Sequence, residues 1–155
     1  MGASCYANWI KSENVGKHDW ENVELSYAEL EENLPDDLVK NDVPNFDGLE
    51  FILDFVARDC ADEKILKKDE DDLIIRMDFD LVRLMIARAI VFWNNLIAIE
   101  TEREFKESPF RFQEFEEYTI ENDTVKLCYL VNRLKAVKDM MRRYKEYELI
   151  VEVEW

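Results

Sequence analysis

The 155-residue chain is 48% hydrophobic and 12% aromatic, which is enough for one folded domain and excludes an intrinsically disordered chain. Only 3 Gly and 3 Pro are present, so long regular elements with few loops are expected. The net charge of −16 disfavours direct binding of nucleic acid or an anionic membrane, because both would be repelled.

The negative charge is concentrated in the first half of the chain. Residues 1–80 hold 22 of the 36 acidic residues and 8 of the 20 basic ones, whereas residues 121–155 hold 7 of each. Such a field attracts basic partners and speeds their association. Solubility alone is the alternative explanation, because acidic surfaces are common.

The N-terminal sequence MGASCY lacks the basic and apolar regions of a signal peptide, and we expect a cytoplasmic protein. Cys5, Cys60 and Cys128 are odd in number and widely spaced, so neither a disulfide framework nor a zinc motif is predicted. Cys60 and Cys128 fall on apolar faces of predicted helices, and we expect both to be small core residues.

Two helices are predicted in the first half from their capping boxes. The first box is SYAE at 26–29, flanked by Leu25 and Leu30 as a hydrophobic staple, and its helix ends at Pro35. The second box is DGLE at 47–50. The apolar stripe of the second helix has helical spacing and comprises Leu49, Ile52, Leu53, Val56 and Cys60.

The densest acidic run, DCADEKILKKDEDD, spans residues 59–72 and holds 7 acidic residues against 3 lysines. We expect Ile65 and Leu66 to anchor it to the core while its carboxylates stay in water. A strand is predicted next, at 73–79 (LIIRMDF), because this stretch is β-branched and partly alternating.

The most apolar stretch, residues 81–100, is long enough to raise the question of a membrane span. Wound as a helix, it places its large apolar residues over about half of the circumference and gathers Arg83, Arg88, Asn94 and Asn95 on the opposite edge. Two arginines and two asparagines would cost several kcal/mol in a bilayer. A buried central helix, outside any membrane, is therefore predicted.

The last third of the chain predicts both strands and a helix. Residues 109–120 (PFRFQEFEEYTI) predict either a third strand or an aromatic-rich loop, and 148–155 (ELIVEVEW) predict a strand. Residues 124–145 form a basic helix with a heptad seam, which indicates close helix packing and raises the alternative of a homodimer through this helix. The seam consists of Leu127, Leu130, Leu134, Val137, Met141 and Tyr144.

The fold class expected from these patterns is mostly α (α+β). It is a compact helical domain around a buried central helix at about 80–105, with a small two- or three-stranded sheet. Neither a linker nor a repeat is visible, so residues 1–155 are expected to form a single domain.

No catalytic motif stands out, and we expect no enzyme, no cofactor and no metal site. His18 is the only histidine and lies in a polar stretch, and no phosphate-binding glycine loop occurs. ExxE pairs at Glu29/Glu32 and Glu114/Glu117 resemble the Mg²⁺ ligands of all-helical nucleotide pyrophosphohydrolases. Such pairs arise readily by chance in an acidic chain, so this hydrolase is kept as an alternative.

The composition favours a non-enzymatic protein that blocks a basic, nucleic-acid-handling protein by placing carboxylates where phosphates normally sit. Acidic immunity proteins and phage-encoded inhibitors are similar in size and charge only. A secretion or assembly chaperone is a further alternative. The candidate partner-binding residues are the acidic run and two aromatic anchors, namely Asp59, Asp62, Glu63, Asp69, Glu70, Asp71, Asp72, Trp9 and Trp20.

Overall fold

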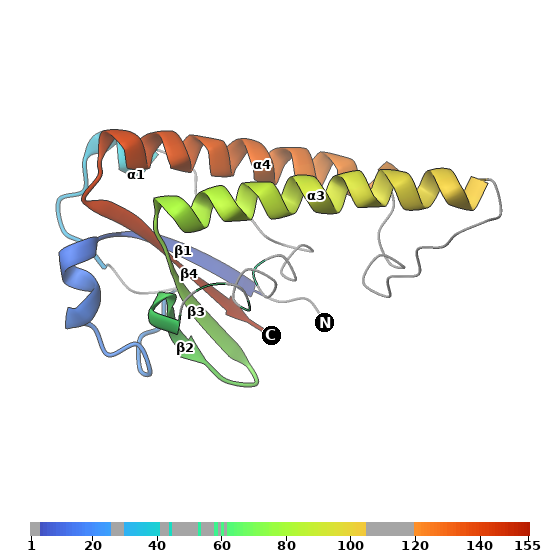
Figure 1. Cartoon of the computed structure of the whole chain (residues 1–155). Helices are drawn as coiled ribbons and strands as arrows, with labels where there is room; N and C mark the ends of the chain where they lie inside the picture. Colours follow the sequence, from blue (N-terminus) through green and yellow to red (C-terminus); the bar gives the residue numbers. More distant parts are fainter. Residues whose placement is uncertain are drawn as a thin grey trace.

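The structure, a computed structural model, describes residues 4–25, 30–40, 44, 53, 58, 60, 62–104 and 120–155. Two long helices lie side by side across one face of a four-stranded antiparallel sheet (Figure 1). The strands are β1 (Ser4–Lys11), β2 (Ile65–Lys68), β3 (Asp72–Met77) and β4 (Tyr147–Glu154). The helices are α1 (Asp36–Lys40), α3 (Phe79–Glu104) and α4 (Ile120–Arg143), with the 3₁₀ turns η1 (Ser12–Lys17) and η2 (Asp62–Lys64).

The expectation of a mostly helical protein is wrong. Of the described residues, 54% are helical and 24% lie in strands, so the fold is a mixed one of helices on a sheet. The sheet has four strands because β1 and β2 add to the two that the sequence pattern predicts. The predicted strands at 73–79 and 148–155 are confirmed as β3 and β4, and the predicted central helix is confirmed as α3.

Strand β4 lies at the centre of the sheet, whose order is β1-β4-β3-β2. It is antiparallel to both neighbours, with Trp9 opposite Leu149 on one side and Ile74 opposite Glu152 on the other. β2 and β3 form a hairpin with an irregular register near its open end. All residues of β4 except Glu154 are buried, because a hydrophobic core covers each face of the sheet.

The main hydrophobic core fills the space between the helices and the sheet. Trp9 contributes from β1, alternate residues of β3 and β4 point the same way, and one flank of α3 meets the seam of α4. The sheet and α3 residues of this core are Leu73, Ile75, Met77, Leu149, Val151, Val153, Leu81, Met85, Ala89, Phe92 and Leu96. Leu81 to Leu96 form the buried flank that the sequence predicts for this helix.

The polar edge of α3 is exposed, as predicted, at Arg83, Arg88, Asn94 and Asn95. One described helix segment, Phe79–Ala98, is long and apolar enough to cross a bilayer, with a mean hydropathy of 1.5. Core helices of soluble proteins meet the same criterion, so length and composition alone do not identify a membrane span. In this fold its apolar flank packs on the sheet and on α4.

The heptad seam of α4 packs within the chain, against α3. Leu127, Leu130, Leu134, Val137 and Met141 are all buried in the main core, so this seam is not available for a second copy of the chain. Cys128 lies one position beyond the seam and is exposed, so the prediction that it is a core residue is wrong. Cys60 is half-buried and packs against the main core.

A second, smaller core covers the opposite face of the sheet. Ile10, Ile74 and Ile150 on the strands meet Val15 of η1 and three later residues outside helices and strands, namely Trp20, Leu25 and Leu30. This second cover explains why Glu148 and Glu152 of β4 are buried although they point away from the main core.

The two predicted capping boxes, at 26–29 and 47–50, lie outside the described residues, as do residues 109–119. In the described part, residues 30–35 are not helical, and the helix there is α1, which begins after Pro35. The staple residues Leu25 and Leu30 are both buried in the second core. Leu53, from the stripe of the second predicted helix, is helical and buried in the main core.

Candidate functional site

The described acidic residues of the run 59–72 lie in two exposed segments and at the first position of β3. Asp62 and Glu63 lie exposed in η2, and Asp69, Glu70 and Asp71 lie exposed in the turn that joins β2 to β3. Ile65 and Leu66 of β2 pack against the main and second cores respectively, as expected for anchors of this run. Asp59 lies outside the described residues.

Asp72 differs from the rest of the run because it is the first residue of β3. Its side chain is mostly buried, and its Oδ2 accepts a hydrogen bond from Lys67 Nζ at 2.8 Å. This hydrogen bond and the nearby charges of Asp72, Asp69 and Glu21 outweigh desolvation and raise the pKa of Lys67. The prediction that Asp72 is an exposed carboxylate facing a partner is therefore wrong.

Hydrogen bonds hold the β2–β3 turn in one conformation. The backbone N–H of Asp69 donates to the carbonyl of Asp72 at 3.0 Å, and that of Asp71 donates to Asp69 Oδ1 at 2.9 Å. The N–H of Trp155 donates to the carbonyl of Asp71 at 2.9 Å, which ties β4 to the turn. The exposed carboxylates are thus presented on an ordered loop.

Trp9 and Trp20 are not exposed anchors, so that prediction is wrong. Their side chains are 4% and 8% exposed and fill the main and second cores, and Trp20 Nε1 donates to the carbonyl of Val15 at 2.9 Å. The exposed indole is that of Trp155, which is 51% exposed and lies next to the acidic turn. Only its position at the end of the alternating stretch 148–155 marks it in the sequence.

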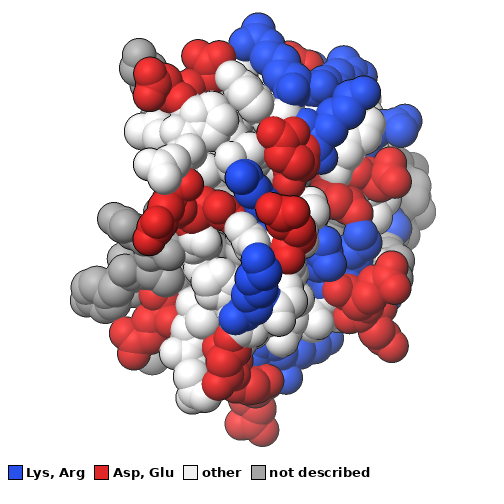
Figure 2. All heavy atoms as spheres, turned by 90° about the vertical axis from the view of Figure 1, so that its left-hand side faces the viewer, with Lys and Arg blue, Asp and Glu red and all other residues white. Residues whose placement is uncertain are grey.

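We call the exposed group formed by Asp69, Glu70, Asp71 and Trp155 the acidic hairpin surface. It has three carboxylates and one indole. The face at the left of Figure 1 is different, because Figure 2 shows acidic and basic side chains interspersed over it.

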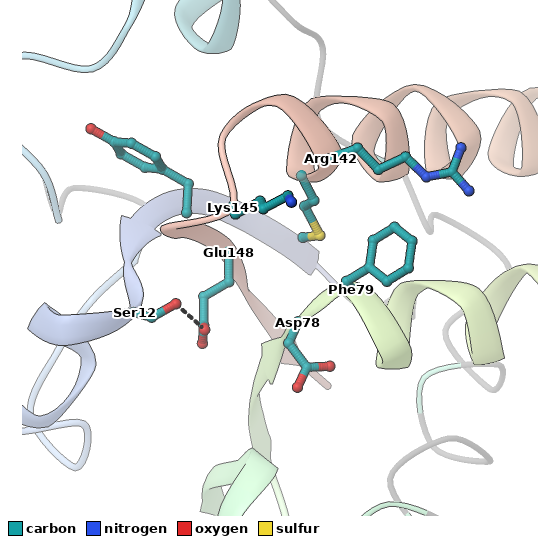
Figure 3. A pocket seen from close by; sticks show the side chains of 8 residues that line it. Ser12, Asp78, Phe79, Arg142, Lys145 and Glu148 are labelled. Carbon is teal, nitrogen blue, oxygen red and sulfur yellow. Dashed lines mark hydrogen bonds between the residues drawn. The ribbon is translucent and has the colours of Figure 1, made fainter.

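A pocket of about 340 Å³ opens between η1, the C-terminal end of α4 and the N-terminal end of α3. Figure 3 shows Ser12, Asp78 and Glu148 on the sheet side of this pocket and Arg142 and Lys145 on the side of α4.

The acidic groups of this pocket are held in ion pairs. Arg76 Nε and Nη2 donate to the two oxygens of Glu148 at 2.7 and 3.0 Å, and Ser12 Oγ donates to Glu148 Oε2 at 2.7 Å. Burial alone would raise the pKa of Asp78, but hydrogen bonds from Lys64 and from the backbone of Leu81 lower it below its ordinary value. Because both carboxylates are engaged by cations, neither is suited to act as a general base.

Comparison with protein-family models, with curated proteins and with solved structures finds no match. The chemistry of the described residues therefore has to carry any functional conclusion.

The hydrolase alternative rests on residues that the structure describes only in part. Glu29, Glu114 and Glu117 lie outside the described residues, so neither ExxE pair can be placed. His18 lies against Trp20, with the ring centroids 5.2 Å apart.

One further acidic group lies beside the hairpin, on the face of the sheet that carries the second core. Asp72, Glu152 and Glu154 each place one carboxylate oxygen within 4.8 Å of the others. The sequence pattern does not predict this group, because Asp72 and Glu152 are brought together only by the pairing of β3 with β4.

Proposed function

We propose that this protein is a non-enzymatic binding protein of the cytoplasm. It engages a basic surface on a nucleic-acid-handling protein through the acidic hairpin surface. The observation that carries the proposal is that Trp155, whose indole is exposed, is hydrogen-bonded through its backbone to a turn that carries three exposed carboxylates.

The charges of this surface are better suited to association than to folding. Exposed carboxylates add little to the stability of a fold, typically under about 1 kcal/mol each. Concentrated on a turn, they attract a basic partner over a distance and lose this effect as salt screens them. The partner would be blocked from binding nucleic acid if these carboxylates occupied the positions where it normally binds phosphate groups.

Trp155 adds an apolar contact area, which the charged side chains do not provide. Tryptophan is among the residues that most often dominate the binding energy of protein interfaces, because burying its indole removes a large apolar area from water. The hydrogen bonds of the turn reduce the ordering that binding requires, and such preorganisation favours affinity. The carboxylates would therefore govern the association rate, and the indole the dissociation rate.

The test is a charge reversal of the hairpin. A partner captured by the wild-type protein at low salt is identified, and its association rate is measured with the variant Asp69→Lys, Glu70→Lys, Asp71→Lys. The expected result is an association at least about tenfold slower, with most of the difference lost near 1 M salt. Asp72 is left unchanged because its side chain pairs with Lys67. A second variant, Glu70→Lys with Asp71→Lys, keeps the side chain of Asp69 that accepts a hydrogen bond within the turn, and it should also slow association.

The matched control carries the same change of charge elsewhere, at the exposed residues Glu13, Glu32 and Glu146. It should slow association much less than the hairpin variant does. Trp155→Ala should mainly raise the dissociation rate. Equal effects of the two reversals, or wild-type binding that ignores ionic strength, would show that the acidity serves solubility alone.

A second candidate function, an assembly chaperone, is favoured by one observation. A pocket of about 310 Å³ lies between α3 and α4, lined mainly by apolar residues that include Ile90, Trp93 and Val131. Val91, Val125 and Tyr129 on the same two helices are also exposed. Ile90→Lys, at an exposed residue that lines this pocket, would weaken chaperone binding of an apolar segment and leave binding by the acidic hairpin surface unchanged.

A further inference from the structure

The register of the sheet gathers three carboxylates at one end of β3 and β4. Asp72 lies directly opposite Glu154, and Ile74 lies opposite Glu152, so Asp72 and Glu152 are diagonal neighbours on the face away from the helices. One oxygen from each of the three acids lies within 4.8 Å of the others. Like charges at this separation repel strongly unless a cation or a proton stands between them.

The group is incompletely neutralised by the protein itself. Glu152 is 1% exposed, and the ion pair that Lys67 makes with this cluster is to Asp72, through Oδ2. In the described part of the chain, three buried side-chain polar atoms lack a hydrogen-bond partner. Two of them are Glu152 Oε1 and Asp72 Oδ1, and the third belongs to Trp9 in the main core. Buried polar atoms are nearly always satisfied, so two orphan oxygens in one acidic cluster point to a missing positive group.

We propose that Asp72, Glu152 and Glu154 bind a hard divalent cation, of the class of Ca²⁺, Mn²⁺ and Mg²⁺. All three ligands are carboxylates, which these ions prefer, whereas zinc and copper favour nitrogen or sulfur. Glu154 is exposed, so the ion can enter from solvent and keep water on its open side.

A proton is the competing occupant of the cluster. Burial, the hydrogen bond to Asp72 and the charges of Asp72 and Glu154 raise the pKa of Glu152 to about 8, against a smaller opposing effect of the backbone N–H of Leu25. In the absence of the cation, Glu152 is therefore mostly protonated at neutral pH. The cation site does not depend on whether the acidic hairpin surface binds a partner, and it is tested on the isolated protein.

The experiment is a calorimetric titration of chelator-treated full-length chain with CaCl₂, MnCl₂ and MgCl₂ in turn. The expected result is one ion per chain with micromolar affinity for at least one of the three metals. Terbium luminescence excited through tryptophan provides a second measurement, because Tb³⁺ has the same preference for carboxylate oxygen. Calcium should compete with the terbium signal.

Two variants assign the site. Glu152→Gln keeps the size of the buried side chain and removes its charge, and Glu154→Gln does the same at the exposed ligand. Each should weaken binding by at least about tenfold. The control Glu70→Gln with Asp71→Asn removes two exposed charges beside the cluster and should leave affinity nearly unchanged.

Circular dichroism establishes that each variant is folded before it is titrated, and Glu154→Gln, at an exposed position, provides an answer if Glu152→Gln fails to fold. Absence of a stoichiometric micromolar site for all three metals would overturn the proposal. Equal weakening by the control and by the ligand variants would also overturn it, because the ions would then be attracted only by the general negative field.

Discussion

Glu152→Gln is expected to stabilise the cation-free protein at neutral pH, because ionisation of Glu152 at this pH favours the unfolded state and a glutamine cannot ionise. The pKa of Glu152 is raised from 4.5 to about 8, mainly by burial and next by the hydrogen bond to Asp72. The folded state therefore holds this proton more tightly than the unfolded state does. As the pH rises above about 4.5, the unfolded state loses the proton first, and the free energy of unfolding falls until the pH reaches about 8.

The size of the effect follows from the same shift. Within this window, each pH unit removes up to about 1.4 kcal/mol from the free energy of unfolding. Between pH 5 and pH 7, ionisation of this single group lowers the stability by about 2–3 kcal/mol. The glutamine side chain has no proton to lose, so the variant should match the wild type near pH 5 and exceed it by about that amount at pH 7.

The assay is urea unfolding followed by tryptophan fluorescence at pH 5, 6, 7 and 8, with EDTA present throughout. Taking the difference between Glu152→Gln and wild type at each pH cancels the titration of groups that the substitution does not touch. Glu70→Gln serves as the control, because Glu70 is exposed and lies outside the cluster, so its substitution should give a much smaller and flatter difference. A difference that is independent of pH, or a glutamine variant less stable than wild type at pH 7, would refute the reasoning.

Three further outcomes are expected. Arg76→Met leaves Glu148 buried without its bidentate partner and should destabilise by about 3 kcal/mol, with part of the loss recovered by adding Glu148→Gln; urea denaturation of both variants checks this. Leu134→Ala opens a cavity where α4 meets the main core and should cost about 2–5 kcal/mol by the same measurement. Cys128 should be the cysteine that reacts fastest with maleimide in the native protein, and mass spectrometry of the labelled peptides would show otherwise if Cys5 or Cys60 reacted first.

The elements that the sequence predicts correctly are those with a single strong period. α3 and α4 carry apolar stripes over many turns, and β3 and β4 are rich in β-branched residues. β1 (SCYANWIK) has no such signature, because Ile10 is its one β-branched residue and apolar residues lie on both of its faces. Cys5, Ala7 and Trp9 pack against the main core, whereas Tyr6 and Ile10 belong to the second. Apolar residues lie on both faces of β1, and the polar Asn8 stands among them, so the sequence shows no alternation of apolar and polar residues. Without that strand pattern, Trp9 is interpreted as an isolated exposed aromatic residue.

Some residues of the candidate sites can likewise be placed from the local sequence, and others cannot. The exposure of Asp69, Glu70 and Asp71 follows from their local sequence, which is a charged turn between two short strands. The burial of Asp72 and Glu152 does not, because it depends on the register of β3 against β4 and on the loop residues that cover this face. No local pattern encodes a pairing between residues so far apart in the chain.

The position of β4 in the sheet also determines the order of events in folding. β4 is the shared partner of β1 and β3, yet it follows both in the chain, and Lys11 must find Tyr147 before the first strand is paired. During synthesis, β1 and the β2–β3 hairpin leave the ribosome before the strand that pairs with both of them, and unpaired strand edges invite aggregation. The local α3–α4 contact can form early, whereas closure of the sheet around residues 147–154 is expected to be the late and slow step. A chaperone that acts on this protein would therefore be needed in the interval before β4 emerges.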